Sequence, residues 1–157
     1  MDGSSAPILV FDVGGSHMAA SVFDLQSKSI GTVRDVRVLP GGEPESFFEA
    51  FESLLRSTLP PPALPQGIAI AIPSPFDYER GISHMQHKFQ SLYLVDLRRE
   101  LSQRLCCPLG GIHFLNDAAA SLIGEMQQGS AVGAKRAIGI TLGTGVGSAF
   151  AVDGEVR

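Results

Sequence analysis

The 157-residue sequence contains no tryptophan and only two cysteines, the neighbours Cys106 and Cys107. Two adjacent cysteines cannot form the disulfide framework of a small secreted protein, and they lack the spacing of a structural zinc site. We expect both to be buried or half-buried thiols. His84, His87 and His113 have no third ligand at a metal-binding spacing, so surface histidines are favoured over a metal site.

Long apolar runs and basic stretches are also absent. No apolar segment approaches the ~20 residues that cross a bilayer, and the N-terminus lacks the features of a signal peptide. The 12 Lys and Arg residues are outnumbered by 16 Asp and Glu, and no basic stretch is longer than Arg98–Arg99. This charge balance disfavours nucleic acid as a partner. We therefore expect a soluble, cytoplasmic protein without a membrane partner.

The sequence is instead rich in glycine, with 18 residues, and its hydrophobic fraction is 44%. These values exclude a disordered tail and a coiled coil and favour an α/β chain with many strand-to-turn junctions. Short apolar runs bounded by glycine, proline or charged residues predict strands. The expected strands are Ile8–Asp12, Met18–Asp24, Gly31–Val38, Gly67–Ile72, Ile112–Leu115, Ala137–Leu142 and Val146–Val152.

Apolar residues at helical spacing predict three helices, at Pro44–Thr58, Leu94–Leu105 and Ala118–Gln128. In the third helix we expect Leu122, Ile123 and Met126 to face inward. The order of elements resembles one and a half copies of a repeated unit, and the last two strands would be left with an unpaired edge and an uncovered face. This order predicts that the chain is the N-terminal half of a larger protein.

The first motif that can carry chemistry is Asp12–Ser16, where a carboxylate at the end of a strand precedes two glycines. The backbone N–H groups of such a turn can face a phosphate. The alternative is an ordinary hairpin turn. The motif is neither a dinucleotide-binding fingerprint, because a strand follows it, nor a P-loop, because no Lys–Ser/Thr pair follows.

Two further motifs follow along the chain. Gly143–Thr144–Gly145 joins two strands and again combines backbone N–H groups with a hydroxyl. Asn116 and Asp117 lie between a strand and a helix, where the structural alternative for Asn116 is a helix N-cap. Two glycine turns of this kind on two hairpins of one chain favour a phosphate-binding function.

In order along the chain, the segments DVGGS, GIAIAIPSPFDYERG, FLNDAAASLIGE and ITLGTGVGSAF resemble the successive motifs of the ROK family of sugar kinases and sugar-responsive repressors. The resemblance extends from Ile8 to Arg157. It implies an α/β fold of the ribonuclease-H-like, actin-like ATPase kind with a mixed five-stranded sheet. The expected domains are a small N-terminal one over residues 1–115 and the beginning of a second, larger one over 116–157.

The resemblance also implies a role for each motif residue. Asp117 would be the general base and Asn116 a sugar ligand, with Ser74 and Pro75 beside the sugar pocket; carboxylates are ionised at neutral pH and can accept the proton of an attacking hydroxyl. Asp12 would lie near Mg²⁺, the metal that accompanies ATP. The remaining residues form the two phosphate turns: Gly14, Gly15, Ser16, Gly143, Thr144 and Gly145.

Three departures from the family pattern bear on function. Ser16 and His17 replace more usual residues, and Ser74–Pro75 replaces Gly–Pro, which leaves the choice of sugar open. The family's later sugar motif and its cysteine-rich zinc loop would lie beyond residue 157, and so would any structural zinc. The family implies a homodimer for the full-length protein, and we expect the 157-residue chain alone to be a poor kinase.

The resulting prediction is a glucokinase-like enzyme that uses ATP to phosphorylate a hexose or an N-acetyl-hexosamine. The alternative is a non-catalytic, sugar-binding regulator of the same family without a helix-turn-helix domain, because only seven residues precede Ile8. Asp117 favours the kinase, since a regulator can dispense with a base. An NAD-dependent oxidoreductase is disfavoured by the missing fingerprint.

Overall fold

The computed structural model describes residues 7–59 and 61–157. The chain divides into two compact units, the first ending at Phe114 and the second comprising Leu115–Arg157. Each unit has its own cluster of buried apolar side chains. Within the described residues, no helix is long and apolar enough to cross a membrane.

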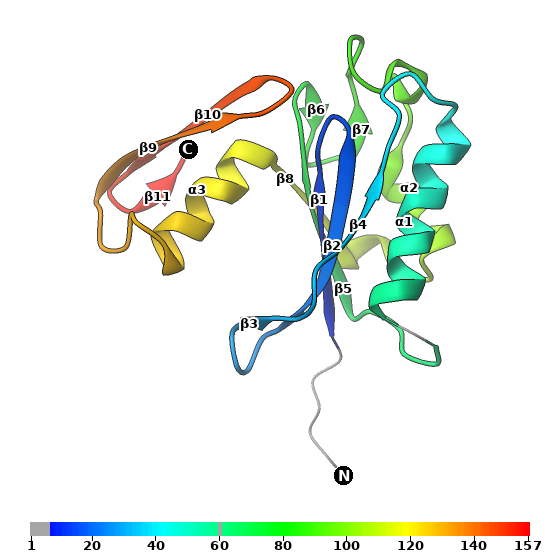
Figure 1. The fold of residues 1–157 in the computed structure, drawn as a ribbon, viewed down its shortest axis with the longest axis horizontal. Coiled ribbons are helices and arrows are strands. Elements are labelled where there is room, and N and C mark those ends of the chain that lie inside the picture. Colours follow the sequence, from blue (N-terminus) through cyan, green and yellow to red (C-terminus); the bar gives the residue numbers. More distant parts are fainter. Residues whose placement is uncertain (1–6, 60) are drawn as a thin grey trace. The chain divides into compact units, whose positions relative to one another are not determined.

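The first unit contains a mixed sheet, as predicted (Figure 1). Its central strand β1 (Ile8–Val13) pairs antiparallel with β2 (His17–Asp24) and parallel with β5 (Gly67–Ile72). The order is β3-β2-β1-β5-β8, and β4 also pairs with β2, so within the described residues the sheet has six strands rather than the predicted five. The other three strands are β3 (Ser29–Ile30), β4 (Arg34–Arg37) and β8 (Ile112–Asn116).

Of the predicted strand Gly31–Val38, only Arg34–Arg37 forms a strand, β4, and the unpredicted β3 precedes it at Ser29–Ile30. Phe23 pairs with Ile30 and Ala20 pairs with Arg34, so three steps along β2 are matched by four steps along its partner. One extra residue on one strand is a β-bulge, which breaks the ladder and increases the local twist. The prediction of one continuous strand was therefore wrong over Gly31–Val33.

The helix α1 spans Pro44–Thr58, as predicted, and Pro44 occupies its first turn. Its buried side chains include Phe47, Phe51 and Leu54. The ring of Phe51 lies 4.7 Å from that of Phe11 on β1, measured between centroids. This phenylalanine contact attaches the helix to the central strand of the sheet.

The helix α2 spans Leu97–Arg104 and begins three residues later than predicted. Leu94 has a φ of 61°, a left-handed conformation that a helix cannot contain. The side chain of Asp96 then accepts a hydrogen bond from the backbone N–H of Arg99 and caps the helix. Leu94 fits the apolar spacing of the helix in the sequence, but it lies outside the helix in the structure.

Arg104 joins α2 to α1. Its guanidinium donates to both carboxylate oxygens of Glu45, at 2.7 and 2.8 Å, and lies 3.3 Å from a carboxylate oxygen of Glu52. The same group lies over the ring of Phe48, 4.6 Å from its centroid. The pKa of Glu45 lies below its ordinary value of 4.5, mainly because Arg104 donates hydrogen bonds to its carboxylate.

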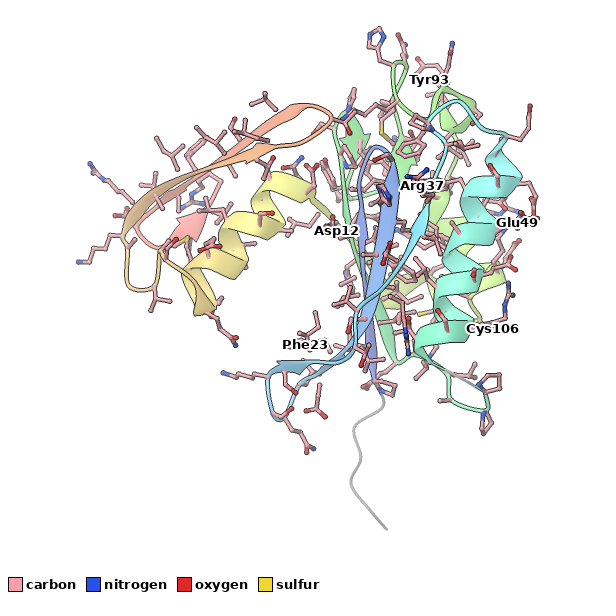
Figure 2. The ribbon with its side chains drawn as sticks, viewed as in Figure 1. Asp12, Phe23, Arg37, Glu49, Tyr93 and Cys106 are labelled. Carbon is pink, nitrogen blue, oxygen red and sulfur yellow. The ribbon has the colours of Figure 1, made fainter. Side chains whose placement is uncertain are left out.

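We predict that Glu45→Gln lowers the melting temperature at neutral pH and that the difference disappears in acid. A carboxylate whose pKa is lowered by folding stabilises the native state above its ordinary pKa, and this contribution is lost as the pH falls through the lowered value. Thermal unfolding of both proteins between pH 7 and 3 measures the effect. Glu49→Gln is the control, because Glu49 is another exposed carboxylate of α1 (Figure 2). A difference independent of pH would contradict the role of Arg104.

The second unit consists of one helix on one small sheet. The helix α3 (Asp117–Gln128) packs on β9 (Arg136–Leu142) and β10 (Val146–Val152), which form an antiparallel hairpin. Asp153 and Gly154 make the predicted turn into β11 (Glu155–Val156), with φ values of 55° and 83°. Leu122 is buried, but Ile123 is exposed, so its predicted inward position was wrong.

The cysteines and histidines differ in exposure. Cys107 is buried, as expected, and burial raises the pKa of its thiol. Cys106 is exposed, so the expectation of a buried or half-buried thiol was wrong for this residue. His84, His87 and His113 are exposed, as surface histidines would be. Within residues 7–59 and 61–157 there is no group of three or more His, Cys, Asp or Glu side chains suited to a metal.

Candidate functional site

The first glycine turn closes the β1–β2 hairpin. The backbone N–H of Gly14 donates to the carbonyl of His17 at 2.9 Å, and a Cβ added at Gly14 would lie 3.1 Å from that same oxygen. Ser16 accepts a hydrogen bond from the N–H of Val38 through its carbonyl, and its hydroxyl lies 3.0 Å from Nδ1 of His17. The turn is thus fixed from both sides, and the N–H of Gly14 is used within it.

Asp12 precedes this turn on β1. It pairs with Ala19 on β2 and with Ala71 on β5. Phe11 and Val13 are buried on the face of the sheet that packs on the helices, whereas Asp12 is exposed on the other face (Figure 2). Because both neighbours are alanines, their side chains leave the carboxylate accessible.

Ser74 and Pro75 lie at the same edge of the sheet as the first glycine turn. Strands β1 and β5 are parallel, so the segments that follow Val13 and Ile72 leave the sheet at one edge. Ligands of open α/β sheets bind beyond the carboxyl ends of such strands. The structure therefore brings the predicted residues of the first unit together at this edge, and both Ser74 and Pro75 are exposed.

Tyr78 holds the Ser74 segment, and sequence reasoning missed it. Its hydroxyl lies 3.0 Å from the hydroxyl of Ser74 and donates to the carbonyl of Ile72 at 3.2 Å. Tyr78 lies in the connection between β6 (Phe76–Asp77) and β7 (Ile82–Ser83), a short hairpin that the sequence analysis did not predict.

Arg98 anchors that connection from α2. Its guanidinium donates to the carbonyls of Tyr78, Glu79 and Ile112, at 3.3, 2.8 and 2.7 Å. The group also lies 5.5 Å from the centroid of the Phe114 ring. These partners are 14 to 20 residues away in sequence, so no local pattern could have identified Arg98.

In the second unit, Asn116 and Asp117 form the N-terminus of α3. The side chain of Asn116 accepts a hydrogen bond from the N–H of Ala119 at 3.1 Å, so the structural alternative for this residue, a helix N-cap, is confirmed. Oδ1 of Asp117 accepts one from the N–H of Ala118 at 2.9 Å. This bond orients the carboxylate in the first turn, where the helix dipole stabilises negative charge.

The second glycine turn is the exposed three-residue loop between β9 and β10. Leu142 pairs with Val146, and the N–H of Gly143 donates to the carbonyl of Gly145 at 3.0 Å. A Cβ added at Gly143 would meet no atom within 4 Å, so this residue borders open space. Thr144 presents its hydroxyl at the centre of the loop and is exposed.

Close packing brings the helix N-terminus near this loop. A Cβ added at Gly147, two residues after the loop, would contact Oγ1 of Thr141 and lie 3.2 Å from Cβ of Ala118. Further along the helix, a Cβ at Gly139 would lie 3.2 Å from Cβ of Leu122. Glycine at these strand positions lets α3 approach the sheet closely. Asp117, next to Ala118, is thereby placed beside the strands that carry the second glycine turn.

The carboxylate beside the first glycine turn is consistent with a Mg²⁺ ion that is bound together with a phosphate. Mg²⁺ is usually held by one or two carboxylates together with the phosphates of a substrate and water. Asp12 offers one accessible carboxylate beside the first glycine turn. It could hold such an ion only together with a bound phosphate.

The architecture is mixed α/β, and it is the architecture of actin-like ATPases and ROK kinases of known structure. The sequence matches the ROK family over residues 8–157, and the chain belongs to this family. Among curated protein sequences, none matches the chain.

Several solved structures are similar to the chain. The inorganic polyphosphate/ATP-glucomannokinase from Arthrobacter sp. strain KM is 29% identical, with a TM-score of 0.80 over 97% of this chain and 60% of that one. A ROK family glucokinase from Streptomyces griseus, in complex with glucose and AMPPNP, is 24% identical, with a TM-score of 0.81 over 97% and 46%. A ROK family transcriptional regulator, a homologue of the E. coli MLC protein, is 17% identical, with a TM-score of 0.74 over 96% and 38%. The chain thus spans about half the length of these proteins.

Proposed function

We propose that the protein is a sugar kinase that transfers the γ-phosphoryl group of ATP to a hydroxyl of a hexose or an N-acetyl-hexosamine. The observation that carries this proposal is the position of Asp117 in a ROK family chain. Its carboxylate is oriented by the N–H of Ala118 at a helix N-terminus, and that helix packs against the strands of the second glycine turn. A regulator has no need of an oriented base at this position.

Each residue has a definite part in the proposed reaction. Asp117 accepts the proton of the attacking sugar hydroxyl, and Asn116 and Ser74, with Pro75, contact the sugar. Phosphoryl transfer depends mainly on positioning and on neutralisation of charge. In each glycine turn the N–H of the first glycine is used within the turn. The backbone N–H groups that would donate to phosphate oxygens are therefore those of Gly15, Ser16, Thr144 and Gly145. Asp12 would hold Mg²⁺, which when bound neutralises phosphate charge.

A steady-state assay of the whole protein tests the proposal. ATP is offered with glucose, mannose, N-acetylglucosamine and N-acetylmannosamine in turn, and we expect turnover on the order of 1–100 per second with at least one sugar. Because a glucomannokinase that uses inorganic polyphosphate is 29% identical to this chain, polyphosphate is tested as a second phosphoryl donor. The disaccharides maltose, cellobiose and sucrose are assayed in the same way, and transfer to none of these sugars from either donor would contradict the kinase.

A calorimetric measurement of sugar binding, made beside the activity assay, separates the kinase from the sugar-binding regulator. The likeness to a ROK transcriptional regulator shows that such proteins share this fold. A regulator would bind a sugar, measured by calorimetry, without releasing ADP in the presence of ATP. In the proposed kinase, sugar binding and ADP release occur together. The proposed kinase acts in the cytoplasm, where both ATP and free sugars are present.

A further inference from the structure

A hollow on the first unit lies outside the residues discussed so far. It has a volume of about 660 Å³ and is lined by Gln86, His87, Gln90 and Tyr93. These residues lie in the connection between β7 and α2, drawn in green, and Figure 2 labels Tyr93 there. The volume is in the range of pockets that bind small molecules, and the hollow is open to solvent rather than enclosed. The connection therefore forms a concave surface of the right size for a ligand.

The segment is held firmly although its polar side chains are exposed. Met85, Phe89 and Leu92 are buried, and the ring of Phe89 packs on that of Phe47 with centroids 5.0 Å apart. The N–H of Phe89 donates to the carbonyl of Pro40 at 3.0 Å, and the hydroxyl of Ser91 donates to the carbonyl of Gly42 at 2.7 Å. The buried anchors alternate with the residues that line the hollow, which are thereby presented from a fixed backbone.

Two residues with a strained backbone conformation flank Gln90 and Tyr93 in the sequence. Phe89 has a φ of 49° and Leu94 a φ of 61°, conformations that bulky side chains rarely adopt. Strained residues of this kind persist where surrounding contacts enforce them, and they cluster at ligand sites. Here they bracket Gln90 and Tyr93. The hydrogen bond from the N–H of Leu94 to the carbonyl of Ser83, at 2.8 Å, helps to maintain the second of them.

The lining chemistry specifies the kind of ligand. Two amides and an imidazole both donate and accept hydrogen bonds, and a phenol adds an apolar face with a polar tip. Among the described residues, those that line the hollow include no carboxylate, lysine or arginine. A phosphate or another strong anion would find no fixed countercharge there. The set instead suits a neutral ring that carries many hydroxyl groups and one apolar face.

The segment that carries the hollow is hydrogen-bonded to the segment of the proposed sugar site. The N–H of His84, at the start of the segment, donates to the carbonyl of Pro75 at 3.1 Å. On this basis, and resting on the proposed function, we propose that the hollow binds a second sugar ring of the substrate. The substrate class is then a disaccharide or glycoside, whose first ring is held beside Ser74 and Pro75.

Calorimetry on the whole protein tests this assignment, with glucose as the single-ring probe and maltose, cellobiose and sucrose as two-ring probes. We expect at least one disaccharide to bind more tightly than glucose. Gln90→Ala and Tyr93→Ala should each weaken its binding by about 3- to 10-fold, the effect of one lost hydrogen bond or contact, and change glucose binding less than twofold. Tyr93→Phe separates the hydroxyl from the ring.

Gln103→Ala is the matched control, because Gln103 is an exposed amide on α2 that does not line the hollow. Thermal unfolding of every variant verifies that the fold is retained. If no disaccharide binds more tightly than glucose, or if the variants bind all probes like the wild type, the second-ring site is refuted. Such a result with sugar phosphorylation intact would leave the proposed kinase standing. Selective loss of disaccharide binding in a protein that transfers no phosphoryl group would instead support the hollow and refute the kinase.

Discussion

Asp117→Asn is expected to reduce the rate of phosphoryl transfer by roughly 10²–10⁴-fold, the usual contribution of a general base. Asparagine has nearly the same shape, and its Oδ1 can accept the same hydrogen bond from the N–H of Ala118. The helix N-terminus should therefore remain intact. A coupled ATP assay measures the turnover, and calorimetry measures the sugar affinity, which should change far less than the rate.

Asp153→Asn is the control for this substitution. Asp153 lies in the turn between β10 and β11 with a φ of 55°, a conformation that asparagine tolerates well. Its replacement removes the same charge from the same unit and should leave turnover unchanged. If Asp117→Asn retained near wild-type turnover, Asp117 would not be the base, whatever the sugar affinity.

Gly143→Val is expected to weaken ATP binding by roughly 10- to 100-fold, which corresponds to the loss of about 1.4 to 2.7 kcal/mol, the size of one hydrogen bond to a charged group. The substitution is well suited to this test, because a Cβ at Gly143 meets no atom within 4 Å and its φ is not left-handed. The added isopropyl group would obstruct a phosphate without displacing the chain. Gly14→Val is a poorer test, since a Cβ there already lies 3.1 Å from the carbonyl of His17.

The matched control for this second substitution is Gly124→Ala. Gly124 also borders open space but lies in α3, where alanine is a better helix former than glycine. ATP affinity should be unchanged in this control, and the melting temperature of Gly143→Val should be close to that of the wild type. Unchanged ATP binding in a folded Gly143→Val variant would show that the second glycine turn does not hold phosphate.

Features set by neighbouring residues could be predicted from the sequence. The helix α1 has its apolar spacing and its proline within its own 15 residues, and it was located to the residue. Asn116 caps α3 through a bond only three residues along the chain. The glycine turns were located because each joins two recognisable strands. The family, too, followed from short motifs in a fixed order.

The tertiary structure decided the features that depend on distant partners. The bulge between β3 and β4 follows from pairing with β2, and the late start of α2 from a left-handed Leu94 held by Ser83. Arg98 reaches carbonyls 14 to 20 residues away, and the segment that carries Gln90 and Tyr93 is held by distant contacts to the chain around Pro40, Gly42 and Phe47. Hydrogen bonds and packing between such groups form only once the backbone has folded, so no local pattern of residue types records them. The sequence therefore determined the main helices and strands and the candidate chemistry, and the fold decided the short strands, the start of α2 and the side chains that hold these elements in place.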